Sequence, residues 1–447
     1  MSSAGVMLST LCKGILDGPD GPMATRPYWW DAAPPSSEQT EPPREVDVAI
    51  VGSGFTGLSA ALTLLRRGRS VAVFDRGVPG FGASTRNGGQ VGSGNQKFRV
   101  RTLIEMRGEA NAVALLREGI AMLDHIEQLV TSEHIDCHFS RCGRFRGAMR
   151  PEHYDSMARD LDDLRRYVGV ESVVVPRAEQ HREIASDLFH GGTVLPNDAA
   201  LHPGLYHAGL LRRVEGAGGL VLGLTPVESI SADRSGFRMQ TPRGEVVARD
   251  VIVATNGYTQ KVHDHLDRRI VPVGSAVIAT EPLPPGLIQE LMPGGRMYGN
   301  TNRVFFYFRA APDQDRIVWG GRVGRGFAAD SPFAFAHLAR DMRRTFPQLG
   351  DVRVTHGWSG QIGYTFDSLP HLGRTPDGIH YAMGYCGTGV SRSTWFGHKI
   401  ALKLIGDPEG ASAFDDIVFP THPFHAVAPA MVPVYEAWYR MRDALDF

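Results

Sequence analysis

The most constraining feature of the sequence is a glycine-rich turn between an apolar run and a helical pattern. Residues 47–51 read DVAIV, a continuous apolar run of strand length, and GSGFTG at 52–57 follows directly. A helical pattern covers 58–67, and a second apolar run ends at Asp75. This order of strand, glycine turn, helix, strand and acidic residue predicts a βαβ unit that binds a nucleotide cofactor.

Each glycine of the turn has a physical role in that prediction. Gly52 allows the tight turn, Gly54 lets the backbone approach a pyrophosphate, and Gly57 permits close helix packing. The helix N-terminus offers free N–H groups and the positive end of its dipole to phosphate. Asp75 is expected to accept hydrogen bonds from ribose hydroxyls, and the turn alone leaves NAD and FAD open. The neighbouring residues assigned to the same site are Ser53, Phe55, Thr56 and Arg76.

Composition and charge argue against several classes of partner. The 447 residues carry a formal net charge of -1, with 42% hydrophobic and 21% charged residues, so no sequence-wide basic field exists to attract nucleic acid. No segment reaches the roughly 18 apolar residues of a membrane span. The cysteines show neither metal-ligand nor disulfide spacing, so we predict a cytoplasmic protein without a metal site. They are Cys12, Cys137, Cys142 and Cys386.

The remaining patterns predict a mixed α/β fold. Helical patterns lie at 102–131, 151–167, 203–215, 333–346 and 392–405. Strand-like runs lie at 219–231, 237–241, 245–254, 270–280, 303–309, 316–320 and 378–383. Because apolar strands recur near 250 and near 380, we predict a Rossmann-like nucleotide-binding domain that is interrupted by a second domain with a mixed or antiparallel sheet.

The domain boundaries follow from that interruption. Residues 1–43 are expected to be an N-terminal extension, because 31–44 are rich in proline and polar residues. The cofactor domain is predicted to comprise 44–130, 190–262 and 355–447. The substrate domain is predicted to comprise 131–189 and 263–354.

Two loops decide between the two cofactors by resemblance. Residues 80–90 read GFGASTRNGGQ, and 384–390 read GYCGTGV before a helix. Both resemble the D-amino-acid oxidase and glycine oxidase superfamily, and the first looks most like the gamma-glutamylputrescine oxidases of that superfamily. The resemblance covers about nine-tenths of the chain and implies FAD. In the first loop it assigns flavin contacts to Ala83, Ser84, Asn87, Gly88, Gly89 and Gln90.

The same resemblance extends the FAD site to other segments. A helix start after 384–390 supplies N–H groups and a dipole that can stabilise negative charge on a reduced flavin. The family's usual Ser and His are Cys386 and Thr388 here, so only the backbone role carries over. The implied contacts are Val227, Ala254, Thr255, Gly257, Gly360, Gly387, Thr388, Gly389 and Val390.

Departures from the family bear on the substrate and the acceptor. Gln361, Ile362 and Gly387 stand where glycine-oxidase-like members carry carboxylate-binding arginines, so an amine is favoured over a simple α-amino acid. Val318 stands where sarcosine oxidases carry an oxygen-activating Lys, and Gly360 stands where they carry a flavin-bonding Cys. We therefore expect non-covalent FAD and leave the acceptor open between oxygen and another carrier.

The predicted reaction is oxidation of an amine C–N bond. The resemblance implies a gamma-glutamylputrescine-like or polyamine-like substrate that passes a hydride to flavin N5, with hydrolysis of the imine to an aldehyde and reoxidation by oxygen to give hydrogen peroxide. Candidate catalytic or pocket residues are Thr388, Tyr364 and Arg322. One alternative is an N-methylated or phosphonate-bearing amino compound, whose anion Arg322 would bind. A second is a flavin-binding regulatory protein without turnover.

Two further groups of residues have competing interpretations. Phe305, Phe306, Tyr307 and Trp319 form either an aromatic wall for a cationic amine or ordinary sheet packing. His202 precedes Pro203 at the start of a predicted helix, where a capping role is favoured over catalysis.

Overall fold

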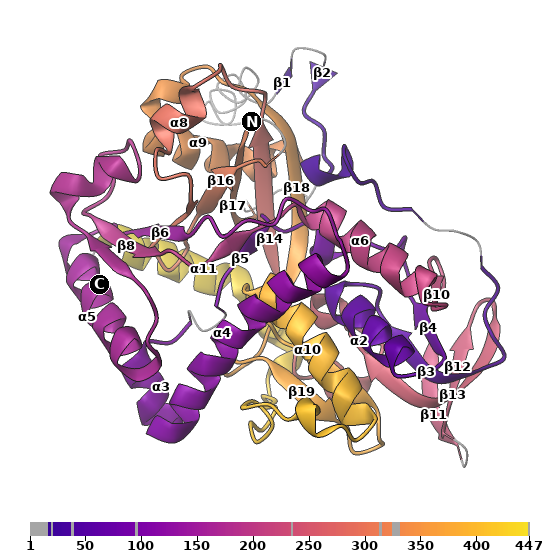
Figure 1. The fold of residues 1–447 in the computed structure, drawn as a ribbon. Coiled ribbons are helices and arrows are strands. Elements are labelled where there is room, and N and C mark those ends of the chain that lie inside the picture. Colours follow the sequence, from indigo (N-terminus) through magenta and orange to yellow (C-terminus); the bar gives the residue numbers. More distant parts are fainter. Residues whose placement is uncertain are drawn as a thin grey trace.

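Two mixed sheets and the helices around them make up the fold in the computed structural model (Figure 1). The structure describes residues 17–18, 21–36, 40–93, 97–233, 236–312, 315–323 and 331–445. The predicted mixed α/β class, with a Rossmann-like sheet and a second mixed sheet, is confirmed.

The first sheet contains the βαβ unit. Its described strands run in the order β10-β4-β3-β13-β12-β11, and β20 pairs with both β13 and β19. Strands β10, β4, β3, β13 and β20 are parallel neighbours, whereas β11, β12 and the first half of β13 form an antiparallel meander. The bounds are β3 Glu45–Val51, β4 Val71–Phe74, β10 Leu220–Leu222, β11 Ser229–Asp233, β12 Gly236–Thr241, β13 Gly244–Val253, β19 His371–Arg374 and β20 His380–Met383.

Helices cover the parallel strands, which explains why these strands are apolar runs without alternation. Helix α2 (Phe55–Arg66) follows the glycine turn and packs on α10 (Gly389–Leu404) from the far end of the chain. The Ser59 hydroxyl donates to the Thr394 carbonyl at 2.7 Å. Helices α6 (Pro203–Gly216) and α4 (Glu109–Ser132) complete this layer.

The second sheet has the strand order β18-β14-β17-β16-β15-β6-β8-β7 and is antiparallel except between β15 and β6. Its aromatic core includes Phe308 stacked on Trp319 at 4.2 Å between ring centroids. The strand bounds are β6 Arg144–Gly147, β7 Val173–Val175, β8 Gly192–Leu195, β14 Val271–Thr280, β15 Met297–Asn300, β16 Tyr307–Ala310, β17 Ile317–Arg322 and β18 Val354–Tyr364. The nearby helices are α5 Pro151–Val168, α7 Asp264–Asp267, α8 Leu287–Leu291 and α9 Ala336–Thr345.

Three predicted elements differ from the structure. The strand pattern at 219–231 is two strands, β10 and β11, which are separated by a loop and lie at opposite ends of the first sheet's strand order. The helical pattern at 102–131 is two helices, α3 (Val100–Arg107) and α4, because Gly108 lies between them with φ +77°. The strand pattern at 303–309 is strand only from Tyr307 onward. The aromatic run satisfied strand periodicity, but the residues before Tyr307 form an irregular segment against the cavity described below.

The domain boundaries stay a prediction. Strand β8, and β18 apart from its first residue, fall in the ranges 190–262 and 355–447 assigned to the cofactor domain, yet both strands pair within the second sheet. The chain passes between the two sheets as often as the five predicted segments require, but it leaves the second sheet only after β8 and again only after β18, later than predicted both times.

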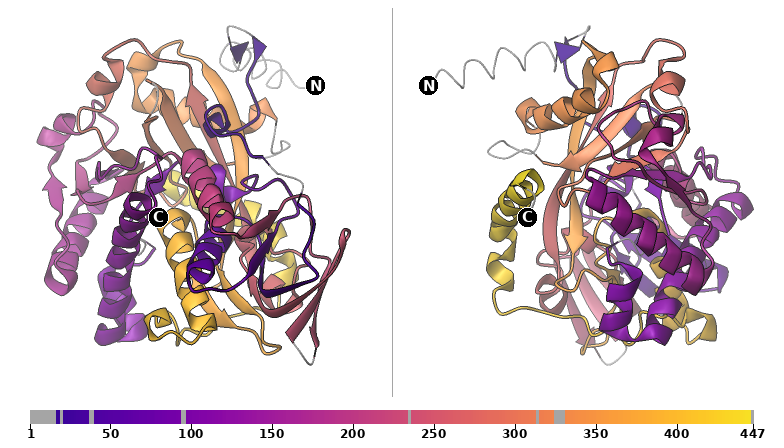
Figure 2. Two further views of the ribbon diagram at one scale, coloured as in Figure 1. Left: turned by 45° about the vertical axis from the view of Figure 1, so that its right-hand side comes forward. Right: turned by 90° about the vertical axis from the view of Figure 1, so that its left-hand side faces the viewer.

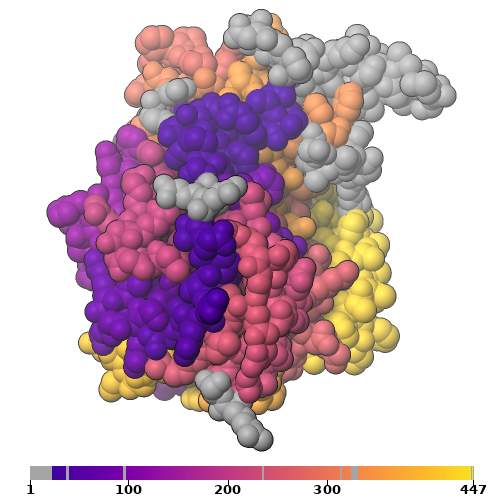
Figure 3. All heavy atoms as spheres, turned by 90° about the vertical axis from the view of Figure 1, so that its right-hand side faces the viewer, coloured from indigo at the N-terminus to yellow at the C-terminus, as the bar shows by residue number. Residues whose placement is uncertain are grey.

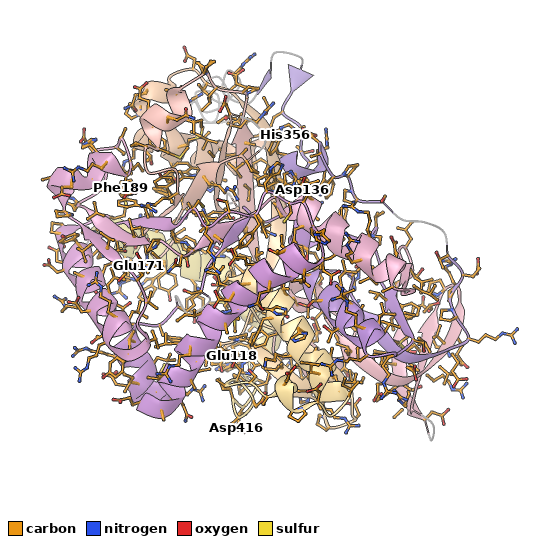
Figure 4. All side chains as sticks on the ribbon, viewed as in Figure 1. Glu118, Asp136, Glu171, Phe189, His356 and Asp416 are labelled. Carbon is orange, nitrogen blue, oxygen red and sulfur yellow. The ribbon has the colours of Figure 1, made fainter. Side chains whose placement is uncertain are left out.

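The N-terminal segment is partly integrated into the fold rather than wholly a tether. A 3₁₀ turn at Tyr28–Trp30 is buried at Tyr28 and Trp29. In the space-filling view, indigo atoms from the N-terminal part of the chain pack directly against later segments (Figure 3). His356 of β18, labelled in Figure 4, lies 3.1 Å from the Asp31 carboxylate. Two short pairs complete the strands, β1 Asp17–Gly18 with β2 Gly21–Pro22, and β5 Gln90–Val91 with β9 Ala199–Ala200.

Helix α11 (Ala428–Leu445) lies along the outside of the molecule (Figure 2). Its inner contacts are polar: Glu436 lies 3.6 Å from Arg322, and the Asp443 carboxylate accepts from the Val304 N–H. Its exposed residues include the apolar series Met431, Val434, Tyr435, Trp438, Met441 and Leu445. In the described residues no helix is both long enough and apolar enough to cross a membrane.

Candidate active site

A cavity of about 990 Å³ brings the sequence-predicted residues together. Residues from the glycine turn, the 80–90 loop, the end of β18 and the 384–390 loop all line it. Residues of the second sheet, including β6, β15 and β17, line it as well. The cavity is therefore positioned to hold a cofactor and a substrate side by side.

The glycine turn has no room for side chains. Gly52 has φ +106°, and a Cβ there would lie 3.0 Å from the Ala254 carbonyl oxygen. A Cβ on Gly57 would lie far inside contact distance of the Gly52 carbonyl. A Cβ on Gly54 would meet the Ser84 hydroxyl at 2.9 Å. Gly52 and Gly57 thus allow strand and helix to meet, and Gly54 leaves space at the helix start.

Asp75 organises the turn from the end of β4. One carboxylate oxygen accepts from the Ser53 N–H at 2.9 Å and from the Ser53 hydroxyl at 2.6 Å, and the other accepts from the Gly77 N–H at 2.9 Å. Ser53 is fully buried and does not line the cavity, so its role here is to hold Asp75. Asp75 itself lines the cavity, where the remaining lone pairs of its carboxylate can accept from a ribose.

The 80–90 loop is held by its own side chains and by indoles from elsewhere. The Asn87 amide donates to the Ser84 carbonyl at 2.8 Å and accepts from the Gly89 N–H at 2.8 Å. Trp29 donates to the Asn87 carbonyl at 2.8 Å, and Trp358 donates to the Arg86 carbonyl at 2.9 Å. These hydrogen bonds fix the path of the loop backbone, and the Asn87 side chain makes two of them.

The 384–390 loop turns sharply into α10. Cys386 is buried with a left-handed φ of +51°, and Gly387 follows at φ +94°. The Tyr385 hydroxyl lies 2.7 Å from the Thr56 hydroxyl, which connects this loop to α2. Arg392 is 1% exposed and donates from Nη1 to the Tyr385 carbonyl at 3.0 Å. Burial lowers the pKa of Arg392 to about 10, so the group still carries its charge at neutral pH.

Nearly all of the sequence-predicted cofactor residues line the one cavity. Four do not: Ser53, Gly57, Gly89 and Gly257. The three glycines pack against backbone, as Gly57 does against Gly52. Those that line it are Gly52, Gly54, Phe55, Thr56, Asp75, Arg76, Ala83, Ser84, Asn87, Gly88, Gln90, Val227, Ala254, Thr255, Gly360, Gly387, Thr388, Gly389 and Val390. The glycine-lined surfaces fit a flat, phosphate-bearing cofactor, and the individual flavin contacts stay predictions.

Comparison with known proteins now decides the family. A family model described as DAO, FAD dependent oxidoreductase, matches residues 47–402. The chain belongs to this family. The predicted FAD cofactor and the predicted enzyme class are thereby confirmed.

Several relatives and solved structures of this family resemble the chain. The gamma-glutamylputrescine oxidoreductase of Escherichia coli is 32% identical over 89% of this chain and 93% of its own length. The probable oxidoreductase OrdL of Haemophilus influenzae is 30% identical over 84% of this chain and 86% of its own length. The crystal structure of glycine oxidase from Geobacillus kaustophilus has a TM-score of 0.70 at 21% identity, covering 85% of this chain and 99% of that one. The last similarity establishes the fold.

Tyr364 is the centre of a charged cluster in this DAO-family cavity. The Lys97 ammonium donates to its hydroxyl oxygen at 3.0 Å, and Arg322 Nη2 does so at 3.1 Å. All three residues line the cavity, and a Cβ on Gly387 would lie 3.6 Å from the same oxygen. The Tyr364 hydroxyl therefore lies next to the loop that precedes α10.

The two cations change the acidity of Tyr364. Burial by itself opposes ionisation of the phenol, but the positive charges of Arg322 and Lys97 and their hydrogen bonds outweigh it. The pKa of Tyr364 is consequently below its usual value. At any given pH a larger fraction of this phenol is therefore ionised than in an ordinary tyrosine, and the ionised form can accept a proton.

The aromatic residues named from the sequence divide into two groups. Phe306 and Trp319 are buried and stack at 4.8 Å between centroids, so they are sheet packing. Phe305 and Tyr307 line the cavity. His202 accepts from the Leu205 N–H at 3.1 Å, which confirms the predicted helix cap.

Sequence reasoning missed several residues of the site. Lys97 lies outside every motif, and Trp29 lies in a segment assigned to a tether. Arg144-Phe-Arg146 had a usable signal, because alternation along a strand places two arginines on the face opposite a buried Phe. The family departures Gln361 and Ile362 do line the cavity, as their position after Trp358 suggested.

Proposed function

We propose that the chain oxidises the primary-amine end of an elongated amine, and that a gamma-glutamylated polyamine is the substrate to test first. The observation that supports this most strongly is the Tyr364 hydroxyl held between Lys97 and Arg322 beside the 384–390 loop. The name of the E. coli relative, gamma-glutamylputrescine oxidoreductase, supports the substrate class. Bound FAD would accept the hydride from the carbon next to the amine.

The chain's own residues then have three tasks. The phenolate form of Tyr364 accepts a proton from the substrate ammonium and becomes the neutral phenol, which leaves the neutral amine that hydride loss requires. The Arg322 and Lys97 cations lower the pKa of that phenol and so favour the phenolate that acts as the base. Cavity residues Phe305 and Tyr307 orient the carbon chain of the substrate. Water released into the cavity hydrolyses the imine to the aldehyde.

The test is anaerobic reduction of the purified flavoprotein by a panel of amines. Polyamines, gamma-glutamylated amines, N-methyl amines and aminophosphonates are mixed with the enzyme, and bleaching of the flavin absorbance is followed. Rapid bleaching by a gamma-glutamylated amine supports the proposal. Preferential bleaching by an aminophosphonate or an N-methyl amine supports the alternative substrate class, and a yellow protein that none of them bleaches supports a regulatory flavin-binding role.

Tyr364→Phe tests the base directly. General-base catalysis contributes roughly 10²- to 10⁴-fold to rate, so flavin reduction by the best amine should slow about a hundredfold or more. Flavin content should not change, because the phenyl ring keeps its place. Tyr435→Phe on the exposed face of α11 is the matched control and should reduce at the parental rate. Parental reduction kinetics in Tyr364→Phe would remove Tyr364 from the proposed reaction.

The electron acceptor and the cytoplasmic location remain proposals. Val318 is buried in β17 where sarcosine oxidases carry a Lys, so we expect oxygen to reoxidise the flavin without help from a Lys at that position. Stopped-flow mixing of reduced enzyme with oxygen, with peroxide detection, measures whether oxygen is the acceptor.

A further inference from the structure

A second cationic region lies in the same cavity, on the wall formed by β6. Arg144 and Arg146 alternate with Phe145 along this strand. Phe145 is fully buried in the core of the second sheet, whereas both arginines line the cavity. Neither arginine belongs to the Tyr364 cluster or to a motif of the cofactor site.

Arg144 and Arg146 differ in whether a carboxylate lies beside the guanidinium. Arg144 Nε lies 3.2 Å from the buried Asp198 carboxylate. Arg146 donates from Nε to the Asn300 carbonyl at 3.4 Å, and no carboxylate among the described residues lies within salt-bridge distance of it. Arg146 is thus a cation that faces a cavity without an anionic partner from the described chain.

The surrounding charges leave an excess of positive charge. Arg99 and Asp160 line the cavity next to Arg146, and the Asp160 carboxylate already accepts from the Val100 N–H at 2.9 Å. Counting Arg144 and its partner Asp198, three guanidiniums face two carboxylates on this wall. The Arg146 side chain is exposed to the cavity, so its donors are open to a ligand, and an oxyanion with two oxygens is the group that such a fork of donors binds best.

We propose that Arg146 binds the carboxylate at the far end of an elongated amine substrate, with Arg99 and Arg144 adding to the attraction. The inference rests on the proposed function, because the amine end of the same molecule would lie at Tyr364. Binding at both ends would fix which carbon faces the flavin. It would also distinguish a gamma-glutamylated amine, which has a carboxylate, from a free polyamine, which has none.

The experiment compares Arg146→Gln with the parent holoenzyme on two substrates. With gamma-glutamylputrescine, KM should rise roughly tenfold to a hundredfold, because a charge-assisted hydrogen bond is lost, while kcat stays within about twofold. With putrescine, both constants should stay at parental values. Arg146→Lys should recover part of the affinity. Arg159→Gln removes the same charge from an exposed position of α5 outside the cavity lining and should match the parent.

A binding measurement separates this inference from the proposed reaction. Glutarate, an unreactive dicarboxylate, is titrated into the oxidised holoenzymes and its binding followed by calorimetry and by perturbation of the flavin absorbance. Weaker glutarate binding in Arg146→Gln than in Arg159→Gln supports the site even if no amine reduces the parent. Equal glutarate binding in both variants, or none in the parent, overturns the inference. A phosphonate of matching length that binds more tightly than glutarate would overturn the choice of carboxylate.

Discussion

At the scale of single residues, the cofactor site depends on positions where a single added carbon atom would clash with neighbouring backbone. Gly57 and Gly216 both lie in helices, but a Cβ on Gly57 would overlap the Gly52 carbonyl, whereas nothing lies within 4 Å of a Cβ on Gly216. Close packing therefore requires a glycine at position 57 but not at position 216. Substitution by alanine at each position should distinguish the two cases.

Gly57→Ala should destabilise the protein and abolish FAD retention. Forcing a methyl group into a packed site typically costs about 1–3 kcal/mol, and here the rigid backbone of Gly52 cannot move aside cheaply. Flavin content per protein and the midpoint of thermal unfolding measure the effect. Gly216→Ala should keep both values, because the added methyl meets open space. Full flavin content in Gly57→Ala would mean that the turn can open without loss of the site.

Tyr364 is expected to respond in opposite directions to two neighbouring substitutions. Lys97→Met removes a cation, so the pKa of the Tyr364 phenol should rise toward its usual value. Glu436→Gln removes the carboxylate 3.6 Å from Arg322, so that pKa should fall further. Ultraviolet difference absorbance of tyrosinate during a pH titration, with Tyr364→Phe as the blank, measures both.

The stability consequence of the same shift has a defined sign. Because the folded-state pKa of Tyr364 lies below its unfolded value, ionisation stabilises the folded protein at alkaline pH, and this contribution is lost as pH falls through the folded pKa. Identical titration curves for the parent and Lys97→Met would contradict the assigned cause.

At the scale of elements, a short N-terminal turn contributes to a loop some 55 residues later. The indoles of Trp29 and Trp30 donate to the Asn87 carbonyl and to the Thr85 hydroxyl, and Trp29 is fully buried. Composition identified the proline-rich stretch that follows but not this turn, because three aromatic residues in a row carry no periodicity. In the structure the turn supports the 80–90 loop through these two hydrogen bonds.

Trp29→Phe should weaken FAD binding while leaving the fold intact. A phenyl ring fills most of the indole volume but leaves the Asn87 carbonyl without its donor, which costs about 1–3 kcal/mol. Because this cost destabilises the loop conformation that binds FAD, the Kd for FAD should rise roughly fivefold to a hundredfold. Titration of apoprotein with FAD by flavin fluorescence measures it. Trp438→Phe on the exposed face of α11 serves as the control, and an unchanged Kd in Trp29→Phe would show that the loop does not depend on this bond.

Predictability from the sequence also divides by element. The unit from β3 to β4 and the two glycine loops could be predicted from the sequence, because strand length, glycine spacing and the helix start are local signals. The break between α3 and α4 at Gly108 could not be predicted, and neither could the division of the aromatic residues between core and cavity. Both depend on which distant elements of the fold pack against these residues. Lys97 has no local signal for chemistry, and the alternation around Phe145 indicates only that Arg146 shares a strand face with Arg144, since the role of each cation comes from the elements that surround the cavity.

At the scale of the whole molecule, the cavity joins both sheets, so cofactor binding and global stability are linked. FAD that binds only the folded chain should raise the free energy of unfolding by about 2.7 kcal/mol when free FAD is a hundredfold above its Kd. Thermal unfolding of apoprotein over a series of FAD concentrations measures the shift. An unfolding midpoint that is independent of FAD would mean that the cavity does not hold the cofactor in the folded state.

The pairing of α2 with α10 has a consequence for how the protein is made. The Ser59 hydroxyl bonds to the carbonyl of Thr394, 335 positions later, and Tyr385 reaches back to Thr56. Contacts between such distant parts of a chain form late, because a long loop must close first. On the ribosome, the glycine turn emerges early but lacks α10 and the 384–390 loop until most of the chain has been synthesised. Flavin capture is therefore a final step of maturation, and a nascent chain stalled before residue 380 should remain colourless.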